Sequence, residues 1–187
     1  MLRKKAALAF RAHSGWAAMV ALGGPTEAPS VILRRHVVIA SGPKQPYHAA
    51  ASLPLSDAGV FIKRCADSAL TLAVNAVQAA VAELEGMGYE IAGTGVLMGS
   101  GRQAGDLAQI LSSHPLLHTA EGQLYRNVLQ QACEACGLVC AGMVEKELKD
   151  PPPECRSLDW GKAVGPPWGR DQKLAAIAAW HILAGNR

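Results

Sequence analysis

Residues 6–21, AALAFRAHSGWAAMVA, decide the fold. An apolar run reaches Arg11 and His13, turns at Ser14-Gly15 and resumes as a second apolar run, which predicts a β-hairpin. Two basic side chains therefore stand near the end of an otherwise buried strand, and buried polar groups require partners. Because binding residues collect where strands end, we expect this strand end to contribute to a site.

The segments that follow the hairpin predict one more strand and then a long helix. Residues 30–41, SVILRRHVVIAS, are rich in β-branched residues, and the basic centre Arg34-Arg35-His36 favours a position at a sheet edge. Residues 42–54 are interpreted as a loop. Residues 58–85 have apolar side chains at helical spacing and few charges, which predicts a long helix packed on more than one side.

The second half of the chain alternates between strands and helices. Turn residues, caps and apolar spacing predict the elements in this order: a strand at 89–98, a glycine-rich loop at 99–105, a short helix at 106–111, a long helix at 116–135, a strand at 138–148, a Pro/Gly-rich linker at 151–168 and a C-terminal helix at 169–184. With 187 residues, the whole chain is expected to form a single domain.

Composition describes a compact globular protein. Half of the residues are hydrophobic, 18% are charged and the formal net charge is +3, so disorder is excluded and an extended nucleic-acid-coating surface is not indicated. The basic start of the chain lacks the apolar length and cleavage site of a signal peptide. No window resembles the roughly 18 apolar residues of a membrane span. We therefore expect a soluble cytoplasmic protein without a membrane partner.

The five cysteines are interpreted as core residues. An odd number in an apparently intracellular chain argues against a disulfide framework. Cys133 and Cys136 could form a zinc site with Cys140 and Cys155, but their place near a helix end differs from the tight turns of zinc ribbons. Packing of small residues is the favoured interpretation.

The order of predicted elements indicates an α/β fold. Three strands in a meander, followed by alternating helices and strands, give a mixed five-stranded sheet with helices on both faces. This order resembles the ribonuclease H-like fold, which is shared by ribonuclease H, Holliday-junction resolvases, transposases and actin-like ATPases. The stretch Ser14-Gly15-Trp16-Ala17 is similar to the turn between the first two strands of the resolvase-like members.

The acidic residues implied by that resemblance are largely missing. Nuclease members have an aspartate on the first strand, where this sequence has Phe10, Arg11 and Ala12. The fourth strand also ends without an acidic residue, and only Asp171, at the start of the last helix, fits the pattern. Cleavage by two metal ions needs clustered carboxylates, so this chemistry is not expected.

The topology predicts a binding site where the parallel strands end, because ligands of open sheets lie there. Arg11 and Arg102 are expected to neutralise an anion, and the glycine-rich loop could wrap its backbone N–H groups around a phosphate. The ligand-binding residues predicted for this edge are Arg11, His48, Gly99, Gly101, Arg102 and Glu145, with His13 beside them.

A second candidate site lies at the start of the 116–135 helix. His118 and Glu121 are three residues apart and share a helix face, with His114 one turn earlier. These three residues, facing His13, could bind Zn²⁺, Mn²⁺ or Fe²⁺. The favoured alternative is a polar helix end in which Glu121 pairs with Arg126 or Arg102.

The leading hypothesis is a ribonuclease H-like domain that has lost the nuclease carboxylates and binds an anionic ligand: a nucleotide, a phosphate ester or a nucleic-acid segment. In this hypothesis His13 and His118 transfer protons and Glu121 orients a histidine. Whether there is turnover stays open. One alternative is a non-catalytic module that assembles into homo-oligomers through the 58–85 helix and the basic edge strand at 30–41. The other is a metal-dependent hydrolase that uses His114, His118 and Glu121 as ligands to a divalent metal.

Overall fold

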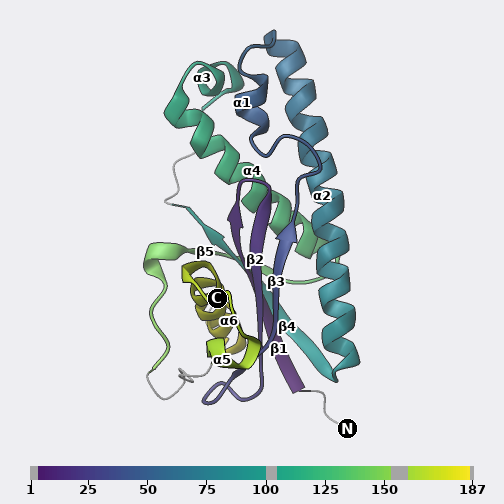
Figure 1. Ribbon diagram of the computed structural model, residues 1–187, viewed down its shortest axis with the longest axis vertical. Coiled ribbons are helices and arrows are strands. Elements are labelled where there is room, and N and C mark those ends of the chain that lie inside the picture. Colours follow the sequence, from purple (N-terminus) through teal and green to yellow (C-terminus); the bar gives the residue numbers. More distant parts are fainter. Residues whose placement is uncertain (1–3, 100–104, 153–159, 186–187) are drawn as a thin grey trace.

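The structure, a computed structural model, describes residues 4–99, 105–152 and 160–185 (Figure 1). The strands are β1 (Lys4–His13), β2 (Trp16–Gly23), β3 (Ser30–Val38), β4 (Tyr89–Met98) and β5 (Cys140–Val144). The helices are α1 (Pro46–Ala50), α2 (Leu55–Gly86), α3 (Leu107–Leu111), α4 (His114–Ala135), α5 (Trp160–Val164) and α6 (Arg170–Leu183), with a 3₁₀ turn, η1, at Glu145–Glu147.

The strands form one mixed sheet in the order β3-β2-β1-β4-β5. β1, β2 and β3 are an antiparallel meander, while β4 and β5 lie parallel to β1. The predicted hairpin is confirmed: His13 pairs with Trp16, and the turn between them places Gly15 at φ 80°, a conformation that favours glycine. β3 is an edge strand, as its basic centre predicts.

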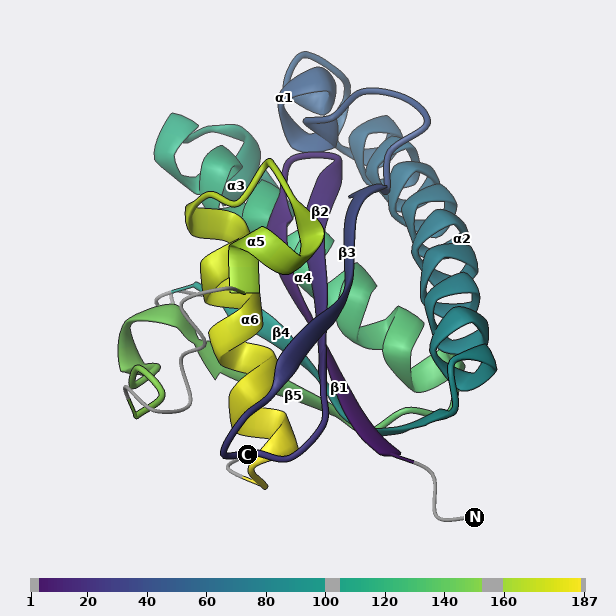
Figure 2. The same ribbon diagram turned by 60° about the horizontal axis from the view of Figure 1, so that its bottom comes forward.

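Helices cover both faces of the sheet (Figures 1 and 2). The side chains of β1 alternate between two cores, because successive residues of a strand point to opposite faces. Leu8 and Phe10 belong to the core beneath α2 and α4, whereas Ala7 and Ala9 belong to the core beneath α5 and α6. The predicted α/β architecture is therefore confirmed, and all four of these side chains are fully buried.

The face of α6 that meets the sheet consists mainly of alanines. Ala175, Ala176, Ala178 and Ala179 are fully buried there. The opposing strand β4 contributes Gly95, where an added Cβ would lie 3.4 Å from Ile182 Cγ1 and 3.2 Å from Met143 Sδ. Side chains this small allow the helix axis to lie close to the sheet.

Helix α2 corrects the expectation that no segment of the chain is long and apolar enough to span a membrane. By length and composition it could cross a membrane, since an 18-residue window reaches a mean hydropathy of 1.3, and 22% of that window is buried. Core helices meet the same criteria. In the fold, one side of α2 packs against the sheet and α4 through Ala69, Ala73, Val77 and Leu84, while most of the window lies outside the core.

Several element boundaries differ from the predictions. Residues 42–54, expected to be a loop, contain α1, and the expected linker 151–168 contains α5. α4 begins at His114, two residues before the predicted start. The last strand ends at Val144 instead of continuing to Leu148, so Glu145 opens the 3₁₀ turn directly after β5.

Candidate anion site and histidine cluster

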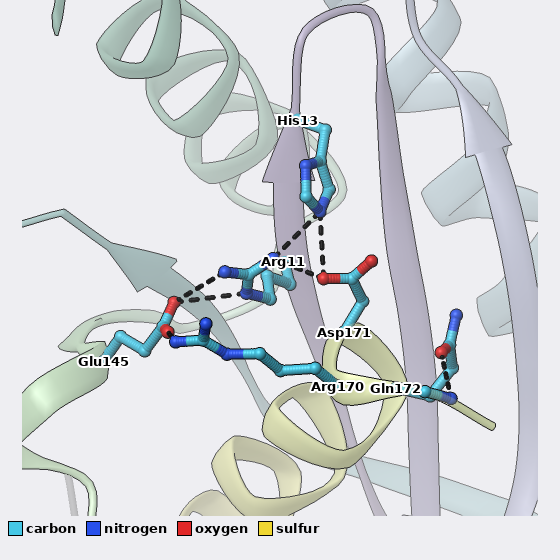
Figure 3. A network of polar contacts seen from close by, with 7 residues as sticks. Arg11, His13, Glu145, Arg170, Asp171 and Gln172 are labelled. Atoms are coloured by element: carbon cyan, nitrogen blue, oxygen red, sulfur yellow. Dashed lines mark hydrogen bonds and ion pairs between the residues drawn. The ribbon is translucent and has the colours of Figure 1, made fainter.

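Arg11 is the centre of an ionic network at the ends of the parallel strands (Figure 3). Its Nε and Nη2 atoms each lie 3.1 Å from Glu145 Oε2, and its Nη1 atom donates to Asp171 Oδ1. Arg170 Nη2 donates to the other oxygen of Glu145 at 2.6 Å. β1, η1 and the first turn of α6 supply these side chains, so the network joins three segments that are distant in sequence.

His13 is held at the edge of this network. Its Nε2 atom lies 2.9 Å from Arg11 Nη1 and 3.0 Å from Asp171 Oδ1. The imidazole ring stacks on Trp16 with 4.3 Å between ring centroids, and Trp16 stacks in turn on His36 at 4.5 Å. Ring stacking and the two polar contacts together fix the orientation of His13.

A groove of about 400 Å³ lies next to the network, at the ends of β4 and β5. Its charged lining comes from Glu145, Lys146 and Arg170. The Lys146 and Arg170 side chains are exposed, so their positive charges are accessible to a ligand. The remaining lining residues are Met98, Gly99, Val144 and Leu174.

Arg126 of α4 lies beside the same groove, although the sequence did not single it out as a ligand-binding residue. Its guanidinium nitrogens are 3.2 and 3.5 Å from the position that a Cβ on Gly99 would occupy. Gly122, one helical turn earlier, leaves the space through which the side chain passes, because a Cβ there would lie 2.8 Å from Arg126 Nη1. Burial lowers the pKa of Arg126. Arg126 makes no hydrogen bond or ion pair with any residue that the structure describes.

Glu121 is a buried carboxylate that caps the N-terminus of the short helix α1. Its side chain is only 2% exposed, and Oε1 accepts hydrogen bonds from the backbone N–H groups of Tyr47 at 2.8 Å and His48 at 3.1 Å. The first N–H groups of a helix lack partners within the helix, so Glu121 supplies them from α4. Burial raises the pKa of Glu121, and the hydrogen bonds from His48 and Tyr47 act in the opposite direction.

The imidazole of His48 also contacts Glu121, through Nδ1 at 3.3 Å from Oε1. This places His48 against two histidines of α4: the ring centroids are 4.7 Å from His118 and 5.4 Å from His114. His114 and His118 approach each other to 3.0 Å between their Nε2 atoms. The three side chains form a histidine cluster, in which each offers a nitrogen within 4.8 Å of the others.

Comparison with known proteins identifies the architecture. No protein-family model matches the sequence, and no curated protein sequence matches it. Among solved structures, T. thermophilus RuvC in complex with a Holliday junction substrate superposes with a TM-score of 0.56, covering 97% of this chain and 95% of RuvC. The fold is ribonuclease H-like. Sequence identity to RuvC is 9%, so the likeness extends to the fold alone.

In this ribonuclease H-like fold, the first-strand positions compared above with a nuclease aspartate are those of Phe10, Ala12 and, as the one charged residue among them, Arg11. Its guanidinium lies between Glu145 and Asp171, so a side-chain cation stands between the two carboxylates. Asp171 lies in the first turn of α6, as the sequence predicts, and its carboxylate contacts Arg11 and His13. Gly101 and Arg102 lie outside the described residues, so their predicted role in the ribonuclease H-like site stays a prediction.

The structure separates residues that the sequence analysis brought together. His13 contacts Arg11, Asp171 and Trp16, whereas His118 contacts the other members of the histidine cluster. Of the predicted ligand set, His114 and His118 lie together, whereas Glu121 faces the start of α1 and the third nitrogen near the two histidines belongs to His48. The pairing of Glu121 with Arg126 is also wrong, since Tyr47 and His48 hold the carboxylate.

Three of the four described cysteines match the core-packing interpretation, whereas Cys65 on α2 is only partly buried and belongs to no core cluster. Cys133 is fully buried, and Cys136 and Cys140 pack against the same core. A hydrogen bond with Cys133 lowers the pKa of Cys140 to about 7, and the same contact, with burial, raises the pKa of Cys133. Among the described side chains, the histidine cluster is the group of potential metal ligands, and no cysteine belongs to it.

Proposed function

We propose that this domain binds the phosphate backbone of a nucleic-acid segment at the ends of β4 and β5 and does not cleave it by two-metal chemistry. The observation that supports binding is Arg126, a half-buried guanidinium beside the groove without a partner among the described residues. A buried charge without a partner is costly, and a phosphate would supply the missing partner.

The other groups around the groove favour an anion. Lys146 and Arg170 are exposed on its lining, while the one lining carboxylate, Glu145, is already bonded to Arg11 and Arg170. A phosphate entering the groove would therefore meet cationic groups and no free carboxylate on the lining. Arginine suits this role because its planar fork donates two hydrogen bonds to one phosphate.

The proposed absence of cleavage rests on the carboxylates that would have to coordinate the catalytic metal ions. Two-metal cleavage requires carboxylates that coordinate the cations holding the attacking and leaving oxygens. Glu145 and Asp171 are engaged by Arg11, and none of the first-strand residues compared with the nuclease aspartate, Phe10, Arg11 and Ala12, is acidic. The likeness to RuvC, a protein solved with a Holliday junction, supports nucleic acid as the ligand class to test first.

Binding can be tested by fluorescence anisotropy with labelled DNA as a single strand, a duplex and a four-way junction. A charge-assisted hydrogen bond contributes about 1.5–3 kcal/mol, so Arg126→Ala should raise the dissociation constant about 10- to 100-fold. It should also reduce the slope of the logarithm of the binding constant against the logarithm of the salt concentration by about 1, as expected for the loss of one phosphate contact. Incubation of the wild-type protein with Mg²⁺ and the same DNA should leave the strands intact.

Arg35→Ala is the matched control, because Arg35 lies on edge strand β3 at the other side of the sheet and pairs with Glu83. Its affinity for DNA should equal that of the wild type. Equal losses in the Arg35 and Arg126 variants, or no binding by the wild type at low salt, would contradict the proposal. Arg102→Ala tests the predicted part of the glycine-rich loop in the same assay.

The assembly alternative has less support from the described residues. It depends on an apolar outer face of α2, yet that face carries Lys63, Asp67 and Thr71, with Lys63 and Asp67 paired at 2.7 Å. Exposed ion pairs of this kind are typical of a solvated helix surface. Self-association therefore stays a prediction that the binding proposal does not require.

A further inference from the structure

The histidine cluster joins two helices at a point away from the groove. His114 and His118 lie one turn apart on α4 with their Nε2 atoms 3.0 Å apart, and α1 contributes His48 from 66 residues earlier in the chain. The three candidate nitrogens all lie within 4.8 Å of one another. A tetrahedral zinc ion with Zn–N bonds of about 2.0–2.1 Å needs nitrogens about 3.4 Å apart, which is within reach of side-chain rotation.

The contact with Glu121 fixes the tautomer of His48. A carboxylate can only accept, so the 3.3 Å contact makes Nδ1 the donor and leaves the lone pair on Nε2. His48 Nε2 is buried and has no hydrogen-bond partner. A histidine that donates one ring N–H to a carboxylate and presents the other nitrogen is the usual arrangement of a metal ligand in proteins.

We propose that His48, His114 and His118 bind a divalent transition-metal ion of the zinc class, with Glu121 holding His48 in the ligating orientation. Three neutral imidazoles suit zinc better than Mg²⁺ or Ca²⁺, which prefer oxygen ligands. Because His114 and His118 are exposed, the fourth coordination position opens to solvent and can hold a water molecule. The site is independent of the groove and of the function proposed for it.

The burial of Glu121 supports the same assignment. Its Oε2 atom is buried without a hydrogen-bond partner, and among the described residues no lysine or arginine forms an ion pair with it. A buried carboxylate in such surroundings lacks a compensating positive charge. A metal ion on His48 would supply that positive charge through the imidazole. This would account for the burial of the Glu121 carboxylate, which is only 2% exposed.

The test uses the full chain, purified without an affinity tag, stripped with a chelator and titrated with Zn²⁺ by calorimetry. One ion per chain is expected. His114→Ala and His118→Ala remove exposed ligands and should weaken Zn²⁺ binding by more than about 100-fold, while Glu121→Gln should weaken it by about 10- to 100-fold. Co²⁺ in place of Zn²⁺ should give the visible absorption of a tetrahedral site, and that absorption should be lost in both histidine variants.

His36→Ala is the control, since His36 is a histidine on β3 that stacks on Trp16 outside the cluster. It should bind Zn²⁺ as the wild type does, and circular dichroism should show that every variant is folded. No stoichiometric Zn²⁺ uptake by the wild type would overturn the proposal and leave a hydrogen-bonded histidine pair. An equal loss in the His36 and His118 variants would overturn it as well.

Discussion

Removal of Arg11 should destabilise the protein more than removal of an arginine whose ion pair lies exposed on the surface. Arg11→Ala leaves Glu145 and Asp171 without their shared cation, in a place where the two side chains are only 28% and 26% exposed. Breaking a fully buried ion pair costs about 3–5 kcal/mol and an exposed pair contributes at most about 1 kcal/mol. For this mostly buried network we expect a loss of about 2–3 kcal/mol in the free energy of unfolding.

The loss can be measured by urea unfolding followed by far-UV circular dichroism. In a chain of this length, about 2–3 kcal/mol corresponds to a decrease of about 4–12 °C in the melting temperature. Asp171→Asn and the double variant complete a double-mutant cycle, in which we expect a coupling of about 1–2 kcal/mol. Arg35→Ala is the control because the pair of Arg35 with Glu83, in which Nη2 contacts both carboxylate oxygens, is exposed, and its loss should stay below about 1 kcal/mol.

Two results would refute this reasoning. A loss in Arg11→Ala no larger than in Arg35→Ala would mean that the network contributes no more than a surface pair. A cycle without coupling would mean that Arg11 and Asp171 do not stabilise the fold through one another. In either case the interpretation of Arg11 as a built-in counter-ion of the two carboxylates would be wrong.

Two further predictions concern buried titratable groups. Burial raises the pKa of Glu121, so its contribution to stability is complete below the unfolded pKa of about 4.3 and is lost as the pH rises through the folded value. The free energy of unfolding should therefore fall with rising pH in the wild type relative to Glu121→Gln, and parallel pH profiles in urea unfolding would contradict this. Because the pKa of Cys140 is about 7, iodoacetamide at neutral pH should modify Cys140 well before Cys133, as peptide mass spectrometry can determine. Equal rates at the two thiols would show that the hydrogen bond between them does not shift their reactivity.

The sequence predicted the sheet well because its signals are local. The hairpin at Ser14-Gly15 and the apolar runs around it follow from residue period and turn chemistry. Helix α1 escaped prediction even though Pro46 stands at its first position, because the group that accepts its free N–H bonds is Glu121, on another helix. A cap supplied by tertiary structure leaves no trace in neighbouring residues.

The candidate sites were predictable only in part. Spacing placed His114 and His118 on one face of a helix, and the topology placed Arg11 and Glu145 at the same sheet edge, where they are in contact. The contribution of His48 to the cluster could not be predicted, because it depends on the unpredicted helix α1. The position of Arg126 depends on Gly122 and Gly99, whose lack of side chains has meaning only once α4 lies across the end of β4.

The alanine face of α6 also sets the distance between Asp171 at the start of this helix and Arg11 on β1. Asp171 lies about 6 to 12 Å along the helix axis from Ala175 and Ala179, on the basis of 1.5 Å per residue. Methyl groups have no rotamers through which a displaced helix could be accommodated, so contact with the sheet fixes the height of α6 above it. The ion pair between Asp171 and Arg11 thus depends on side chains that carry no charge and lie one to two turns away.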